Sequence, residues 1–303
     1  MESARILAGQ MGQMLLYIAV GYLLARTRLL SQEGSRGLTN VLLYAVLPCA
    51  IVSALQQERS PERMIQVLLS ILLAAAALGI AMLIAALFFR GRGVDNFGAA
   101  FSNAGFMGIP LVSALLGPEA VGFAAGMVAL LNVLQWTYGQ WLLTGDQKQM
   151  SLRACLTSPM VISFALGLAL FFSGLRLPAL VTRTLSAMSA CNGPLAMIVL
   201  GALLGRGKLL ALITDPHGWL CSAVRLLLIP AVTLLLFWLV PAKYQAIRMA
   251  VFLTACAPVG SNVAVYAQRA GLDASYASRT VCLSTLLSVV TMPLMILLAE
   301  TLW

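Results

Sequence analysis

The stretch that decides the fold runs from Phe101 to Leu111 (FSNAGFMGIPL), in the middle of an apolar segment long enough to cross a bilayer. Gly105, Gly108 and Pro110 interrupt the helical pattern there, because glycine weakens a helix interior and proline removes a backbone donor. A second interruption (APVGSN, residues 257–262) falls late in the chain. In lipid, such a break survives only where protein or water satisfies the freed backbone groups. Two interrupted spans, one in each half, predict the binding site of a transporter.

The composition of the chain places it in a membrane. Of its 303 residues, 61% are hydrophobic and 10% are charged, and the mean hydropathy is +0.94. A soluble domain of this length could not bury so much apolar surface, so we expect an all-α polytopic protein surrounded by a lipid bilayer. The formal charge of +9 suits cytoplasmic loops rich in Lys and Arg. No basic face interleaved with aromatic residues occurs, so no nucleic-acid partner is expected.

The usual signs of a metal or redox centre are missing from the sequence. The cysteines form no Cys-x-x-Cys pair, and nearly all lie in apolar segments, which is typical of small buried hydrophobes. They are Cys49, Cys155, Cys191, Cys221, Cys256 and Cys282. His217, the single histidine, falls in a predicted loop, so a histidine-based metal centre is excluded and no cofactor is expected.

Coupling ions are constrained by the positions of the carboxylates. No Asp or Glu lies well inside a predicted span, and Asp95 and Glu300 lie at span ends. A proton relay at the membrane midplane is therefore not expected. Coupling to Na⁺ through carbonyl and hydroxyl groups stays open, as does uncoupled export of an anion driven by the membrane potential.

About ten apolar segments of roughly twenty residues can be drawn as membrane spans. The first five are residues 5–25, 37–56, 64–89, 95–117 and 119–144, and the second five are 158–175, 184–205, 219–240, 245–268 and 274–301. A polar linker, residues 145–157, joins the halves 1–144 and 158–303. The linker is too short to hold a soluble domain, so we expect two membrane units of five helices each.

The two halves share a pattern of prolines and helix breaks that predicts an inverted repeat. The second span of each half carries a proline, Pro48 or Pro194, and the fourth span of each carries the break. An odd number of spans per half gives the halves opposite orientations, as in many secondary transporters. Loop charges favour an N-terminus and a C-terminus outside the cytoplasm of a cell membrane. The basic residues then on the cytoplasmic side are Arg26, Arg28, Arg36, Arg90, Arg92, Lys148, Arg153, Arg206, Lys208, Arg269 and Arg279.

Several short motifs, in order and at matching spacing, resemble the auxin efflux carrier family and its plant PIN members. Met107-Gly108-Ile109-Pro110-Leu111, with Asn103 ahead of it, resembles the signature of the family's fourth helix. Ala257-Pro258-Val259-Gly260 resembles the break in its ninth helix. Further matches over nearly the whole chain are Gly21-Tyr22-Leu23, Leu29-Leu30-Ser31, Leu47-Pro48, Arg225 with Pro230, Leu283-Ser284-Thr285 and Pro293.

The resemblance implies a fold and a substrate class. It implies ten helices in two inverted five-helix repeats, with the fourth and ninth helices crossing at their broken centres. It also implies a scaffold of the first, second, sixth and seventh helices, often a homodimer, and export of small organic anions. The chain lacks the long central cytoplasmic loop of the plant members, and Ser261-Asn262-Val263 stands where they carry a further proline. These differences argue against auxin itself as the substrate.

The two interruptions supply most of the candidate substrate-binding residues. Pro110 suits the start of the second half of the fourth helix, and Ser261 or Asn262 can cap the second half of the ninth. Both half-helix N-termini would then direct a positive dipole end at one point, which favours an anion. The amides at the breaks either satisfy the broken backbone or face the substrate, and the two roles are compatible. The candidates at the breaks are Asn103, Gly108, Pro110, Pro258, Gly260, Ser261 and Asn262.

Other polar residues within the spans have two interpretations each. Asn132 and Gln135 share a face of the fifth span, where they either line a cavity or bond neighbouring helices. Ser284 and Ser288 share a face of the tenth span, for which packing is the favoured interpretation. Arg225 lies near the start of the eighth span, where a charge either serves function or snorkels to the cytoplasmic interface, and snorkelling is the favoured interpretation.

The favoured function is a secondary carrier that moves a small organic anion, such as a carboxylate, by alternating access at the crossing of the fourth and ninth helices. A channel-like anion pore is the first alternative. A membrane-embedded enzyme is the second, but no His-Glu-x-x-His, intramembrane aspartate pair or serine–histidine arrangement supports it. We therefore expect a transporter rather than an enzyme.

Overall fold

A computed structural model describes residues 2–146, 153, 156–207 and 214–303. Nearly all of these residues are helical, and no strand is present among them apart from one isolated bridge. Most of the predicted linker 145–157 lies outside the described residues, as do Cys155 and the two loop lysines Lys148 and Lys208. The α-helices include α1 (Glu2–Arg26), α2 (Gln32–Val41), α3 (Leu47–Ala54), α4 (Pro61–Phe88), α5 (Gly93–Ala100), α6 (Ile109–Leu116), α7 (Val121–Leu134), α8 (Gln140–Thr144), α10 (Pro159–Ser173), α11 (Ala179–Ala190), α12 (Asn192–Arg206), α14 (Pro216–Ala223), α15 (Ile229–Trp238), α16 (Gln245–Ala255), α17 (Asn262–Arg269) and α18 (Ala274–Leu302).

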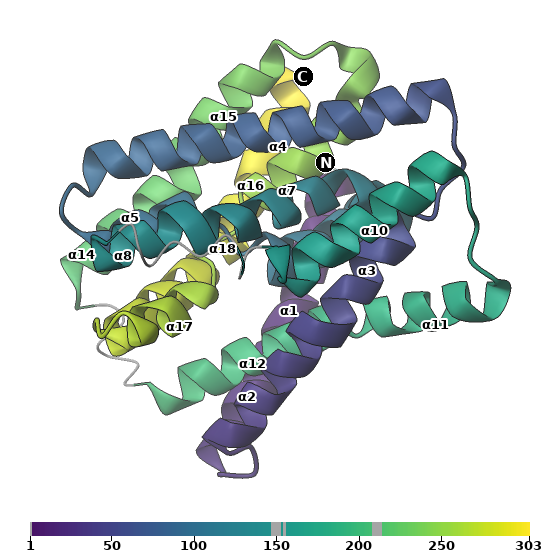
Figure 1. The fold of residues 1–303 in the computed structure, drawn as a ribbon. Helices are drawn as coiled ribbons and strands as arrows, with labels where there is room; N and C mark the ends of the chain where they lie inside the picture. Colours follow the sequence, from purple (N-terminus) through teal and green to yellow (C-terminus); the bar gives the residue numbers. More distant parts are fainter. Residues whose placement is uncertain (1, 147–152, 154–155, 208–213) are drawn as a thin grey trace.

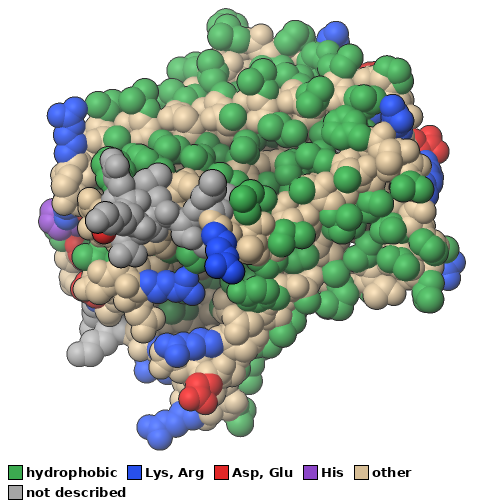
Figure 2. All heavy atoms as spheres, viewed as in Figure 1, with side chains coloured by type: hydrophobic (Ala, Val, Ile, Leu, Met, Phe, Trp, Pro, Cys, Tyr) green, Lys and Arg blue, Asp and Glu red, His purple; other side chains and the backbone are tan. Residues whose placement is uncertain are grey.

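The helices form the bundle of a membrane protein (Figure 1). Among the described residues, six helical segments are long and apolar enough to cross a bilayer: 32–54, 61–88, 118–144, 179–206, 216–238 and 274–302. Shorter apolar helices cover 104–116 and 159–173. Hydrophobic side chains are spread over much of the surface in Figure 2, and Lys and Arg lie mainly toward the left, the right and the bottom of the view. The prediction of an all-α polytopic membrane protein is confirmed, whereas the inverted repeat stays a prediction.

Loop residues with specific conformations decide where several helices begin and end. The Ser60 hydroxyl accepts a hydrogen bond from the Arg63 N–H (3.1 Å) at the start of α4, directly before Pro61. Such an N-cap satisfies one of the backbone donors that the first helical turn leaves unpaired. Gly145 and Gly174 end α8 and α10 with positive φ values of 69° and 74°. A left-handed residue at this position stops a helix, and glycine adopts it without steric cost.

Three helices cross a proline by means of a π-helical turn. The turns η1 (Leu42–Val46), η2 (Ala104–Gly108) and η6 (Val224–Leu228) each end two residues before a proline, namely Pro48, Pro110 and Pro230. A proline ring clashes with the carbonyl four residues earlier in an α-helix. The wider π turn relieves that clash, so each helix continues past its proline.

The break in the fourth span lies earlier than the sequence predicts. Non-helical backbone occupies residues 101–103, between α5 and η2, whereas Gly105 and Gly108 lie within η2 and Pro110 within α6. The expectation that Pro110 begins the second half of this helix is therefore wrong. The second half begins at Ala104, because the π turn carries the helix through both glycines and the proline.

The two broken spans cross at their open segments. Ser102 and Val259 form an antiparallel bridge, in which the Asn103 N–H donates to the Pro258 carbonyl (2.7 Å) and the Gly260 N–H donates to the Phe101 carbonyl (3.0 Å). A Cβ atom at Gly260 would lie only 3.1 Å from the Phe101 oxygen. Glycine thus permits the close approach of two backbones at this crossing, which we call the crossover.

Loop contacts define the two ends of the bundle. We call the end at which α1 begins the N-terminal face. It includes the loops 55–60 and 174–178, which an ion pair between Glu58 and Arg176 (3.0 Å) joins. The other end, the opposite face, includes the loops 27–31 and 89–92 and the end of α12, where Arg206 donates to the Ser31 carbonyl (2.8 Å). In Figure 1 the loops 55–60 and 174–178 lie at the right of the view.

Candidate functional site

A small cavity lies at the crossover, with a volume of about 30 Å³. We call it the crossover cavity. Its walls come from both broken spans and from the second and fifth spans, through Leu43 and Leu47 on one side and Val128 on another. It brings together a set of polar residues far apart in the sequence. These are Ser102, Asn103, Asn132, Gln135, Ser261 and Asn262, with Gly260 beside them.

Three buried donors around this cavity have no hydrogen-bond partner in the described part of the chain. They are the Ser102 hydroxyl, the Asn103 side-chain amide nitrogen and the Gln135 side-chain amide nitrogen. Their side chains are 2%, 5% and 1% exposed. The Asn262 amide nitrogen donates to the Gln135 carbonyl oxygen (3.2 Å), which fixes the orientation of the Gln135 amide. A buried donor left unpaired costs about 1–3 kcal/mol, so the cavity is suited to a ligand that accepts hydrogen bonds.

Two helix N-termini face the same cavity. η2 begins after Asn103 and α17 begins after Ser261, and neither N-cap residue makes a side-chain capping bond. Ser261 occupies the N-cap position of α17 but makes no side-chain capping bond, and Asn262 is the first helical residue, so the predicted capping by Ser261 or Asn262 is wrong for this structure. The Asn262 amide nitrogen donates to Gln135. Each N-terminus carries about half a positive elementary charge. Their uncapped N–H groups add to the three unpaired side-chain donors.

The remaining predicted residues have structural positions beside the cavity or outside it. Asn132 lines the cavity but also accepts a bond from Ser158 (3.5 Å), which ties it to the start of α10. Pro258 supplies the carbonyl that Asn103 binds. Gly108 packs against α16, where an added Cβ would lie 2.9 Å from the Thr254 methyl group. Pro110 lines a second, larger cavity.

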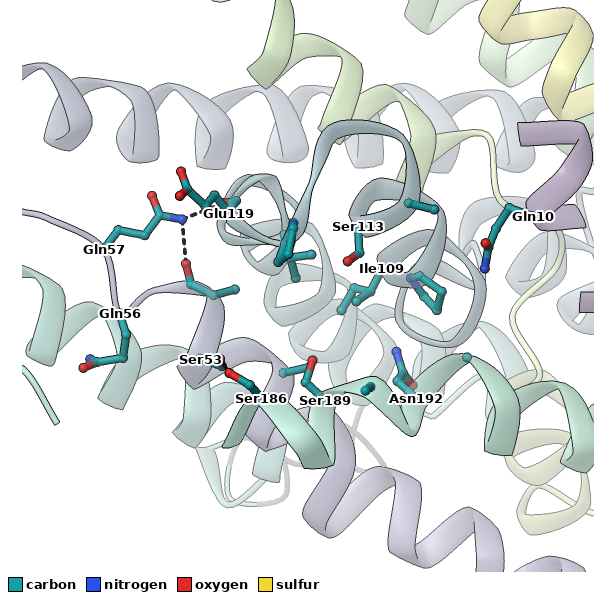
Figure 3. A pocket seen from close by; sticks show the side chains of 18 of the residues that line it. Gln10, Ser53, Gln56, Gln57, Ile109, Ser113, Glu119, Ser186, Ser189 and Asn192 are labelled. Carbon is teal, nitrogen blue, oxygen red and sulfur yellow. Dashed lines mark hydrogen bonds between the residues drawn. The ribbon is translucent and has the colours of Figure 1, made fainter. Parts of the chain in front are cut away.

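That second cavity is a vestibule of about 1030 Å³ at the N-terminal face (Figure 3). Its wall includes Gln10 and Gln13 of α1, Ser53 of α3, Ser113 of α6 and Ser189 of α11. Figure 3 shows Ser53 and Ser186 close together, and their hydroxyls are 3.3 Å apart. Amide and hydroxyl groups thus line the route by which solvent reaches the second half of the fourth span.

Asn192 lies between the vestibule and the crossover. It is 1% exposed and lines the vestibule, and its amide nitrogen donates to the Gly105 carbonyl of η2 (3.0 Å). Its side-chain carbonyl oxygen has no partner among the described residues. Asn192 is not among the candidates predicted from the sequence. The sequence does hold a signal that could have identified it: Asn192 is a polar residue two positions before Pro194, in the span that corresponds to the one with Pro48.

The rim of the vestibule carries more positive than negative charge among its described residues. Arg63 pairs with Glu119 (3.2 Å), and Arg176 pairs with Glu58 (3.0 Å). Arg59 also lines the rim and pairs with no described carboxylate. Such an excess favours the entry of anions, and salt screens it because these groups are exposed.

The position of Arg225 in the sequence predicts that its side chain snorkels to the interface, but the structure shows that it does not. It is 1% exposed and donates to backbone carbonyls on both sides of the crossover. Its guanidinium binds the Ala99 oxygen (2.9 Å), the Ala257 oxygen (3.2 Å) and the Ala255 oxygen. The prediction is wrong because the ends of α5 and α16 present carbonyls within reach in the protein interior, so the cation is satisfied without water.

Polar contacts connect helix starts at the opposite face. The buried Asp95 carboxylate accepts a bond from the Tyr276 hydroxyl and pairs with Arg92 (3.2 Å), which in turn contacts His217 Nδ1 (2.7 Å). His217 is exposed and lies in the first turn of α14 rather than in a loop. These contacts join the starts of α5, α14 and α18.

An aromatic stack lies beside the crossover cavity. The ring centroids of Phe97 and Tyr266 are 5.3 Å apart, as are those of Tyr266 and Trp136, and Arg269 lies over the Trp136 ring. These aromatic contacts connect α5, η4 (Gln135–Gly139) and α17 next to Gln135.

Comparisons with known proteins agree with this architecture. A family model described as membrane transport protein matches residues 6–296. A protein described as an uncharacterized transporter, from Methanothermobacter thermautotrophicus strain Delta H, is 26% identical over 292 residues, which cover 92% of this chain and 94% of the relative. The matched motifs, the bundle of apolar helices and this coverage lead to one conclusion: the chain belongs to the membrane transport protein family that includes the auxin efflux carriers.

Proposed function

We propose that the protein is a secondary transporter that moves a small organic anion, with a carboxylate group, across the cell membrane. The observation that carries the proposal is the set of three unpaired donors around the crossover cavity: Ser102, Asn103 and Gln135. An ionised carboxylate only accepts hydrogen bonds, at two oxygens, so it matches such a set. Two helix N-termini at the same point favour a negative charge there.

The difference between the two cavities supports a carrier over an open pore. The vestibule of about 1030 Å³ reaches inward from the N-terminal face, whereas the crossover cavity of about 30 Å³ has room for little more than one water molecule. Contacts around Asp95 and Tyr266 connect helices toward the opposite face. We propose alternating access, in which these contacts open when the vestibule closes. In the predicted orientation the vestibule would open to the outside of the cell.

Membership of a transporter family favours transport over the enzyme alternative. The electrostatics of the site extend that conclusion to the substrate class. Arg59 adds positive charge at the rim, and the crossover cavity holds donors without a matching carboxylate among its lining residues. A cationic substrate would meet like charge at both places.

The proposal is tested with the variants Asn103→Ala and Gln135→Ala. A hydrogen bond to a charged group contributes about 1.5–3 kcal/mol, so each variant is expected to weaken anion binding about tenfold or more. The measurement is a screen of organic acids by thermal shift on purified protein, followed by affinity for the best ligand, because a ligand that binds only the folded state raises its melting temperature.

A matched control is Ser70→Ala on α4. Ser70 is buried like Asn103 and Gln135, but its hydroxyl donates to its own helix at Val67 (2.7 Å), and it lines neither cavity. Binding by this variant should equal that of the parent. If both amide variants are folded and bind the anion as tightly as the parent, the crossover cavity is not the binding site. The anion would then be expected to bind in the vestibule beside Asn192.

A further inference from the structure

The buried arginine beside the crossover has an unusual set of partners. Arg225, on η6, is 1% exposed, and in the described part of the chain it pairs with no carboxylate. Its guanidinium instead donates to the carbonyls of Ala99, Ala255 and Ala257. A buried cation without a carboxylate partner is costly, so these carbonyls must offset the loss of its hydration.

Two of these carbonyls, those of Ala99 and Ala255, have lost their ordinary helical partners. In an α-helix, the Ala99 oxygen would accept from the N–H of Asn103, and the Ala255 oxygen from the N–H of Val259. Here the Asn103 N–H donates to the Pro258 carbonyl (2.7 Å), and the Val259 N–H donates to the Ser284 hydroxyl (3.2 Å). The crossover thus diverts both donors, and Arg225 replaces them.

The positive charge of Arg225 also balances the partial negative charges at these helix ends. α5 and α16 both end at the crossover, and each C-terminus carries about half a negative elementary charge. The single positive charge of Arg225 offsets the two ends together. The N-termini of η2 and α17, which face the crossover cavity, keep their partial positive charge because no described side chain caps them.

We propose that Arg225 is a positioning residue that neutralises the C-terminal ends of α5 and α16 and thereby leaves the crossover cavity with a spare positive potential for an anion. This inference rests on the proposed function, because it explains how the cavity selects charge. Without Arg225, the negative ends of the two helices would cancel the positive ends across the crossover, and a neutral ligand would bind as well as an anion.

The test compares two probes of the same shape and different charge, propionate and propionamide, at neutral pH. Their affinities for the purified full-length protein are measured by thermal shift, and the ratio of the two affinities is the readout. For Arg225→Gln, which keeps amide donors and removes the charge, we expect this ratio to fall about tenfold or more. A purely structural role would lower the melting temperature and leave the ratio unchanged.

The matched control is Arg248→Gln. Arg248 is also buried (2% exposed) and also donates to main-chain oxygens, at Val240 (2.8 Å) and at the last residue, Trp303 (3.1 Å), but it lies away from the crossover at the N-terminal face. The control should lose stability and keep the parent's affinity ratio. An unchanged ratio in a folded Arg225→Gln variant overturns the role of Arg225 and leaves the proposed anion site intact.

Two further outcomes are decisive. If the unaltered protein binds propionate no better than propionamide, the proposed anion site itself fails, and the role of Arg225 fails with it. If Arg225→Gln does not fold, the test is made on the unaltered protein, by measuring its affinity for malonate. The pH is kept well above both pKa values of malonate, so that malonate is a dianion. A balanced crossover has about one spare positive charge, so malonate should bind no tighter than propionate. Malonate binding about tenfold tighter would show that the charge of Arg225 is not offset by the helix ends.

Discussion

The tight packing of α1 against α12 gives a prediction that the structure makes quantitative. A Cβ atom added at Gly201 of α12 would lie 2.0 Å from the Ile18 carbonyl oxygen and 2.9 Å from the Tyr22 backbone nitrogen of α1. Gly21 on the facing helix is as crowded, at 2.1 Å from the Ile198 oxygen. Because the neighbours are backbone atoms, they cannot rotate away, and Gly201→Ala must push the two helices apart.

The size of the effect follows from this geometry. An ordinary van der Waals contact needs at least 3.4 Å, so the local separation must grow from 2.0 Å to that value. Overpacking of this kind costs about 1–3 kcal/mol. Alanine in a helix recovers about 0.5–1 kcal/mol relative to glycine. We expect a net loss of about 1 kcal/mol in the free energy of unfolding and a melting temperature lower by about 2 °C.

The assay is thermal melting of purified variants, with Gly12→Ala as the control. Gly12 lies on α1, and no neighbouring atom lies within 4 Å of the place that an added Cβ would occupy, so this variant gains helix propensity without a clash. The two alanine variants should therefore shift the melting temperature in opposite directions. A Gly201→Ala variant that melts at or above the parent would refute the close approach of α1 and α12. Transport should also fall in Gly201→Ala, since both helices line the vestibule through Gln13 and Asn192.

Three further predictions concern orientation, coupling and the vestibule. A reporter active only in the cytoplasm, fused after Trp303, should give no signal, and a strong signal would overturn the proposed N-out, C-out topology. Transport in vesicles at clamped membrane potential should change little with an imposed pH gradient. The reason is that Asp95, the buried carboxylate among the described residues, is ion-paired with Arg92 at the opposite face. Strict dependence of transport on protons would contradict this prediction. Asn192→Leu should lower stability by about 1–3 kcal/mol, because the Gly105 carbonyl loses its donor, and a parent-like melting curve would refute that bond.

Hydropathy and helix-breaking residues together predict most of the helical segments. The expected spans at 64–89, 119–144 and 274–301 correspond closely to the observed segments 61–88, 118–144 and 274–302. Span length and apolar composition are set by the bilayer itself, so a single sequence carries this signal clearly. The orientation of the repeats depends on weak charge differences between loops, and it stays a prediction for that reason.

Local rules failed where the tertiary structure supplies an unexpected partner. Proline rules placed the fourth-span break at Pro110, but a π turn relieves the clash and moves the break to residues 101–103. The expectation for Arg225 assumed that only water could satisfy its charge, whereas diverted carbonyls from two distant helices do so. Neither arrangement has a local signature, because each depends on segments far apart in the sequence or on backbone geometry beyond the proline itself.

The positions of the polar residues show how the crossover reconciles stability with binding. Each broken helix needs partners for its freed backbone groups, and the crossover supplies them by pairing Ser102 with Val259 and by placing Arg225 at the C-terminal ends. These contacts satisfy carbonyl groups and leave donors unpaired on the other side, at Asn103 and Gln135. In an apolar membrane interior, unpaired donors raise the free energy of the empty state. A bound carboxylate would lower that free energy without any rearrangement of the backbone, and this difference is the binding energy that the proposed transporter would use.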